Sequence, residues 1–148
     1  MSANPNTLSL DPNTPPQATG YLLLFRNTDW THDEMSADEI RRNLEKVKTW
    51  FDGLSATGKL VAAQPLMEES VVVSGKGGSS VIDGPFTEAK EVIGGYVLLS
   101  VESMEEAVTI AKTNPMHDCG LVTEVRPASN ACPHTYRALS RLAGAAAV

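Results

Sequence analysis

Short apolar segments alternate along the chain with longer segments in which apolar residues recur every three or four positions. The short segments predict strands, because each is brief and is bounded by residues that favour turns. Two further apolar segments flank Gly75-Lys76-Gly77-Gly78 and predict a β-hairpin with glycines at its tip. The predicted strands of the main sheet cover residues 21–26, 60–66, 96–101 and 121–126, and those of the hairpin cover residues 71–73 and 80–82.

The two longer segments predict amphipathic helices. Ser36-Ala37-Asp38-Glu39 and Ser103-Met104-Glu105-Glu106 both match the capping box that begins a helix. An apolar stripe follows each box at steps of three and four. Gly58 is expected to end the first helix, and Asn114-Pro115 the second.

The region between the hairpin and the third main strand is rich in glycine. Asp83-Gly84-Pro85 predicts a turn, and Gly94-Gly95 is expected to separate a short helical turn at residues 86–92 from the strand that follows.

The order of elements is strand, helix, strand, hairpin, strand, helix, strand. This order favours an α+β fold in which a ferredoxin-like antiparallel sheet carries two helices on one face. Residues 20–127 form the predicted domain. Residues 1–19 contain four prolines and are expected to form a flexible arm, while residues 128–148 form a tail with a short helix.

Two predicted strands are apolar on both faces, at residues 21–25 and 96–101. Two helices can cover only one face of the sheet, so a second surface must cover the other. The simplest candidate is a second copy of the chain, packed sheet against sheet. The sequence therefore predicts a homodimer.

Composition restricts the possible partners. Among 148 residues, 42% are hydrophobic, and the formal net charge is -6 without a local basic stripe, so nucleic-acid binding is not expected. There is no signal peptide and no apolar stretch near ~18 residues, so no membrane span is expected. Two cysteines are too few for a disulfide framework and indicate a reducing compartment. A cytoplasmic location follows as an expectation.

One motif carries a family resemblance. The segment at residues 83–91, Asp-Gly-Pro-Phe-Thr-Glu-Ala-Lys-Glu, followed by Gly94-Gly95-Tyr96, resembles the signature of the DGPF-motif group of YCII-related proteins. Residues 21–30, Gly75-Lys76 and residues 124–127 resemble other parts of that group, so the resemblance spans residues 20–127.

The resemblance implies a ferredoxin-like fold that pairs into a dimeric α+β barrel, with a cleft between the sheet and the partner. It does not imply a known reaction. Some YCII-like proteins resemble muconolactone-type isomerases and dehalogenases, in which a histidine and an aspartate are proposed to move protons. Genes of the DGPF group often lie beside genes for sigma factors, which implies a possible regulatory role with a sigma factor as partner.

Asp83 and His117 are the candidate catalytic residues. Asp83 could act as a general acid or base, or it could simply form a turn. His117 could transfer protons near neutral pH, or it could be an exposed loop residue. Phe86 is either a pocket wall or a core residue.

Four further residues are candidates for substrate binding. Arg26 and Arg126 could hold a carboxylate, or they could pair with Glu124 at the dimer seam. Trp30 could cover a pocket, or it could pack onto the start of the first helix.

No cofactor motif is present. The segments His117-x-Cys119 and Cys132-x-His134 mirror each other, but their spacing is not a common zinc pattern, and no metal site is expected. Two functions remain open. The first is a small-molecule-binding dimer, and its catalytic form would be an acid–base enzyme such as an isomerase, lyase or dehalogenase that acts on a small carboxylate. The second is a non-catalytic regulatory module that binds a protein partner.

Overall fold

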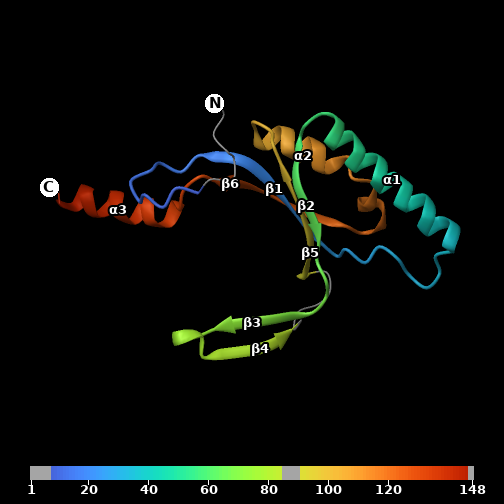
Figure 1. Cartoon of the computed structure of the whole chain (residues 1–148), viewed down its shortest axis with the longest axis horizontal. Coiled ribbons are helices and arrows are strands. Elements are labelled where there is room, and N and C mark those ends of the chain that lie inside the picture. Colours follow the sequence, from blue (N-terminus) through green and yellow to red (C-terminus); the bar gives the residue numbers. More distant parts are fainter. Residues whose placement is uncertain (1–7, 85–90, 147–148) are drawn as a thin grey trace.

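The computed structural model describes residues 8–84 and 91–146, and its centre is a four-stranded antiparallel sheet (Figure 1). The order of the strands across the sheet is β2-β5-β1-β6. This is the ferredoxin-like arrangement that the sequence predicted. The strands are β1 (Ala18–Arg26), β2 (Leu60–Pro65), β5 (Ile93–Leu99) and β6 (Val122–Ser129).

Two helices, α1 (Ala37–Ala56) and α2 (Met104–Lys112), cover one side of this sheet (Figure 1). Both begin where the capping boxes predicted. The Ser36 hydroxyl accepts a hydrogen bond from the Glu39 N–H, and the Ser103 hydroxyl accepts one from the Glu106 N–H, each at 3.1 Å. Gly58 follows the end of α1 with a φ of 71°, which a glycine adopts without strain.

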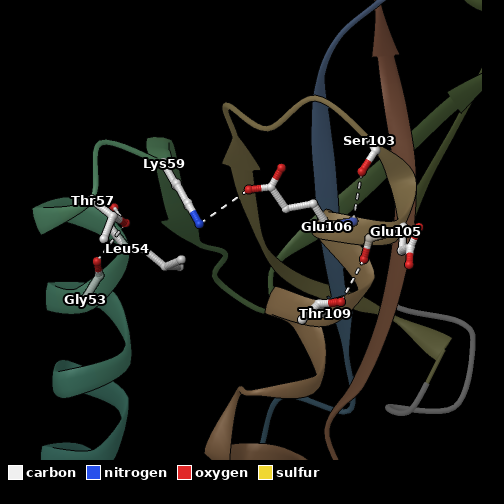
Figure 2. A network of polar contacts seen from close by, with 8 residues as sticks. All are labelled: Gly53, Leu54, Thr57, Lys59, Ser103, Glu105, Glu106 and Thr109. Carbon is white, nitrogen blue, oxygen red and sulfur yellow. Dashed lines mark hydrogen bonds and ion pairs between the residues drawn. The ribbon is translucent and has the colours of Figure 1, made fainter.

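A group of polar contacts connects the ends of these elements (Figure 2). Thr57 donates its hydroxyl to the carbonyl groups of Gly53 and Leu54 at the end of α1. Lys59, just before β2, lies 3.4 Å from the carboxylate of Glu106 in the first turn of α2. Both side chains are more than a third exposed, so this ion pair contributes at most about 1 kcal/mol.

The core lies between the sheet and the two helices. Leu23, Val97 and Leu99 are fully buried there, and the central strands β1 and β5 supply all three. Leu54 of α1 and Ile110 of α2 pack against them. The alternation along each strand therefore sends one set of side chains into the core.

The other set of side chains points to the opposite face of the sheet, which we call the open face. It includes Leu22 and Leu24 of β1 and Leu98 of β5, all of which are only half-buried. Their register places Leu22 opposite Leu98 and Leu24 opposite Tyr96. The two central strands are thus apolar on both faces, as the sequence indicated, whereas α1 and α2 cover only one (Figure 1).

The predicted hairpin forms a separate two-stranded sheet of β3 (Ser70–Ser74) and β4 (Ser80–Gly84), with a short 3-10 turn at its tip. The predicted turn at residues 83–85 is wrong in its first two positions, because Asp83 and Gly84 belong to β4. Asp83 pairs with Val71, so the ladder of the hairpin extends further than its apolar residues do. Residues 85–90, including Phe86, lie outside the described residues.

Gly94 and Gly95 were expected to precede a strand, but they lie inside β5. Gly95 is opposite both Phe25 of β1 and Pro65 of β2. A Cβ atom on Gly95 would come within 3.1 Å of the Gln64 carbonyl oxygen. The two glycines therefore allow close approach of neighbouring segments and do not end an element.

Strand pairing and hydrogen bonds also involve residues before position 20 and after position 127. Ala18 is opposite Ser129, so the pairing of β1 with β6 continues to the first residue of β1 and the last residue of β6. Before β1, the Ser9 N–H donates to the Asn130 carbonyl at 2.7 Å, and the Gln17 N–H donates to the Asn130 side chain at 2.6 Å. The tail forms α3 (Pro133–Ala146), which is longer than the short helix expected. Across the described ranges, no helix has the length and apolarity needed to cross a membrane.

The N-cap of α2 provides a test of the fold. Ser103→Ala removes the acceptor for the Glu106 N–H, and we expect the free energy of unfolding in urea to fall by about 1 kcal/mol. Ser103→Asp is the matched control, because an aspartate also caps a helix, and it should retain most of the stability. Equal losses in both variants would contradict a capping role.

Candidate functional site

A largely apolar cavity of about 280 Å³ lies beside the helix-covered side of the sheet. Its walls come from five parts of the chain that are distant in sequence: the end of β1 with the loop after it, α1, β2, β5 and the region of the 3-10 helix η3 (Pro115–Cys119). The apolar side chains that line it include Phe25, Trp30, Val47, Phe51, Ala63 and Met116.

The loop after β1 brings Trp30 to the cavity. Asn27 adopts a φ of 55° and donates its side-chain N–H to the Gly120 carbonyl at 2.8 Å, which turns the chain at the end of the strand. The Asp29 carboxylate then accepts hydrogen bonds from the backbone N–H and the hydroxyl of Thr31. These local bonds define the conformation of the loop that carries Trp30.

Gly94 allows that loop to lie directly against β5. A Cβ atom at this position would overlap the side chain of Thr28. Thr28, Gly94 and Gly95 all line the cavity. The glycine pair of the motif region therefore shapes one wall of the cavity through close packing of backbone against side chain.

The polar groups of the cavity are uncharged. Asn114 is 7% exposed, and its side-chain oxygen accepts a hydrogen bond from the Met116 N–H at 2.9 Å. Thr28 and Gln64 also contribute to the lining. No Lys, Arg, Asp or Glu is among the described residues that line the cavity. An uncharged, mostly apolar guest matches such a lining better than a carboxylate does.

Three predicted residues come together elsewhere, on the open face. Arg26 donates to the Glu124 carboxylate at 3.1 Å, and the Arg126 Nε lies 3.9 Å from the other oxygen of that carboxylate. Glu124 lies opposite Leu24, so it is diagonal to Arg26 on the same face, and Arg126 follows two residues later along β6. Phe25 points into the core, so Arg26, the next residue along β1, is on the opposite side of the sheet from the cavity.

His117 and Asp83 are not brought together. The His117 Nε2 is 2.9 Å from the Thr123 hydroxyl, and both line a second, more open hollow of about 410 Å³ with Lys112. Asp83 is exposed on β4 of the separate hairpin. Among the predicted candidates within residues 8–84 and 91–146, only Trp30 lines the apolar cavity.

Most cavity residues escaped the sequence analysis. Val47 and Phe51 belong to the apolar stripe of α1, and Ala63 to an ordinary strand, so nothing in the sequence distinguishes them from core residues. The available signals were Gly94-Gly95, inside a strand, and Asn114-Pro115, which turns the chain into η3. Each marks a place where the backbone borders the cavity.

The two cysteines differ in environment. Within residues 8–84 and 91–146, no three His, Cys, Asp or Glu side chains gather as a metal site would require. Cys132 is exposed and lies just before α3. Hydrogen bonds from the backbone and hydroxyl of Thr135, and from the backbone of His134, lower the pKa of the Cys132 thiol. Cys119 is half-buried, with its sulfur 3.9 Å from the Asn43 side chain.

A lowered thiol pKa makes a testable difference in reactivity. The thiolate is the nucleophile, so a lowered pKa gives Cys132 a larger thiolate fraction near neutral pH than an unperturbed thiol. We expect iodoacetamide to modify Cys132 faster than Cys119, as measured by mass spectrometry of peptides. The rate of modification of Cys132 should also level off at a lower pH than that of an unperturbed thiol. Faster modification of Cys119 at neutral pH would contradict this account.

Comparison with known proteins places the chain in a family. No curated protein matches the sequence significantly. Among solved structures, 5-chloro-2-hydroxyhydroquinone dehydrochlorinase from Burkholderia phenoliruptrix AC1100, in complex with 2,5-dihydroxybenzoquinone, matches with 17% identity and a TM-score of 0.42. That match covers 74% of this chain and 92% of the other, and the similarity is too low to support an inference about activity. The model of the YCII-related domain matches residues 22–128, and the chain therefore belongs to the YCII-related family.

Proposed function

We propose that this protein binds a small, uncharged and largely apolar molecule in the cavity between α1, η3 and the sheet. The observation that supports the proposal is the cavity itself, with aromatic walls and a few neutral polar groups. Concave sites of this composition are typical of small-molecule binding.

The size of the cavity restricts the ligand. A volume of about 280 Å³ lies near the lower end of the range for ligand sites. A cavity of about 150 Å³ is enough for benzene. The proposed ligand is therefore a single substituted ring or a compound of similar size.

The lining suggests how such a ring would be oriented. Phe25, Phe51 and Trp30 offer aromatic surfaces, and aromatic pairs prefer offset or edge-to-face contact. Asn114 and Gln64 offer neutral hydrogen-bonding groups. A ligand with one or two hydroxyl or carbonyl groups would satisfy both kinds of surface.

An acid–base reaction through Asp83 and His117 is a weaker proposal. A general acid or base must come within hydrogen-bond reach of the reacting group. His117 contacts Thr123 in the other hollow, and Asp83 is exposed on the hairpin. We therefore propose binding, and turnover would be tested only on a compound that binds.

We also propose that two copies pair through their open faces, sheet against sheet. Leu22, Leu24 and Leu98 form an apolar centre on this face, and the Arg26–Glu124 pair lies beside it. In a two-fold dimer the same patch of each chain faces its copy. An apolar centre then packs on an apolar centre, and the charged groups lie at the rim. A regulatory module that binds another protein through this face is the alternative, and the oligomeric state distinguishes the two.

A thermal-shift screen against small phenols, quinones and lactones tests the cavity. At a concentration about 100-fold above Kd, a ligand stabilises the native state by about 2.7 kcal/mol. For a domain of this size, that corresponds to a rise in Tm of about 5–10 °C.

Ala63→Leu should reduce the shift caused by any hit, because the larger side chain occupies part of the cavity. Ala56→Leu, at an exposed position near the end of α1, is the matched control and should leave the shift unchanged. A hit that shifts Ala63→Leu as much as the wild type binds elsewhere, and the cavity would then not be its site.

The open-face pairing predicts a concentration-dependent dimer. Leu98→Lys places a charge on the open face opposite Leu22 and Ala62, with no carboxylate directly across from it. Sedimentation velocity should therefore show a monomer at concentrations where the wild type is a dimer. Leu44→Lys, at an exposed position on α1, should sediment as the wild type does. If Leu98→Lys remains a dimer of unchanged affinity, the open face is not the interface.

A further inference from the structure

The β3–β4 hairpin exposes an unusual amount of apolar surface. Its two strands contain five large β-branched apolar residues, and each is about half exposed or more: Val71 58%, Val72 50%, Val73 63%, Val81 63% and Ile82 48%. The pair Val73–Val81 lies on one face of the ribbon, and the pair Val72–Ile82 lies on the other. Both faces of the hairpin are therefore apolar and in contact with solvent in the single chain.

The four-stranded sheet does not stabilise this hairpin through strand pairing. Its strands form a sheet with each other and are not part of the four-stranded sheet. An isolated two-stranded hairpin is at best marginally stable in water. Its outer edges also present unpaired backbone groups. An apolar, neutral ribbon with free edges is expected to be stabilised by a surface that covers it.

The position of the hairpin indicates where that surface lies. Figure 1 shows the hairpin standing away from the four-stranded sheet, with its tip directed away from α1 and α2. The helices cover one side of the sheet, so the hairpin extends beyond the sheet on the side where the open face is uncovered. A body packed on the open face would lie next to the ribbon.

The exposed area supports a second copy as that body. The chain exposes 10566 Å². A compact monomer of this mass is expected to expose about 7,300 Å². The difference, on the order of 3,000 Å², is larger than the ~1,000–2,500 Å² that each subunit contributes to most permanent interfaces, so the chain has enough surplus surface for one.

We propose that the β3–β4 hairpin is an arm that packs on a second copy of this chain. The proposal rests on the homodimer proposed above and adds a second contact region to it. In a two-fold dimer each chain would contribute one arm and receive the other, so every apolar ribbon is covered. Residues 70–84 contain only Lys76 and Asp83 as charged side chains, which fits an apolar receiving surface rather than a charged one.

The first experiment removes the apolar character of one face and keeps its shape. Val73→Thr/Val81→Thr replaces a cross-strand pair with residues that also favour strands. If the pair is buried in the dimer, the two new hydroxyl groups should raise the dimer dissociation constant at least about tenfold, as measured by sedimentation equilibrium. The control is Leu44→Gln, at an exposed position on α1, which should leave the dissociation constant unchanged. Thermal unfolding of the variant under monomeric conditions checks that the fold is intact.

The second experiment measures hydrogen exchange of the hairpin amides in the wild type at high and low protein concentration. Amides of β3 and β4 that pair within the hairpin should be protected in the dimer and should exchange much faster in the monomer. Amides of the core strand β1 serve as the internal reference.

The outcomes separate the two proposals. A wild-type chain that stays monomeric at every concentration would overturn both the pairing and the arm. A wild-type dimer whose hairpin stays unprotected, and whose affinity does not change in Val73→Thr/Val81→Thr, would overturn the arm alone. In that case the hairpin would be free for a different protein, which is the alternative occupant.

Discussion

The rest of the structure depends on the central position of β1. This strand pairs with β5 on one side and with β6 on the other, and Leu23 at its middle is completely buried. Because side chains alternate along a strand, β1 sends Tyr21, Leu23 and Phe25 into the core and Leu22 and Leu24 to the open face. A strand that is apolar on both faces needs cover on both sides. One cover is supplied by α1 and α2, and the uncovered face is the physical reason to expect a partner.

The same strand also leads into the proposed binding site. At its end the chain turns through Asn27 and continues into the loop that carries Trp30. This loop lies against Gly94, where the Cβ atom of any other residue would overlap Thr28. The cavity therefore forms where the regular packing of helix on sheet ends, with Phe25 and Phe51 forming the walls. Its neutral lining and the charged cluster on the open face lie on opposite sides of one sheet, so they do not form a single site.

The open face combines an apolar centre with an ion pair that is about one-third exposed. The Arg26–Glu124 contact gains strength if a partner excludes water from it, but desolvation then also costs free energy. Such a pair contributes more to the register of an interface than to its affinity. The hairpin adds apolar area outside this face. Both surfaces contribute to the large exposed area of the chain.

The sequence by itself determined the order of the elements, both N-caps and the family. These features depend on local patterns: a capping box binds its own helix, and a two-sided apolar strand is recognisable by composition. Local patterns were insufficient at Asp83 and at the glycine pair. Asp83 is part of a ladder with Val71, and Gly94 and Gly95 lie inside a strand where a Cβ atom would meet Thr28 or the Gln64 carbonyl. The pairing of Arg26 with Glu124 was one of two alternatives that the sequence left open. Only the tertiary structure separated Asp83 from His117 and assembled the cavity from Val47, Ala63 and Met116. Those residues are far apart in the chain, and their proximity depends on strand register and helix packing, which no local pattern encodes.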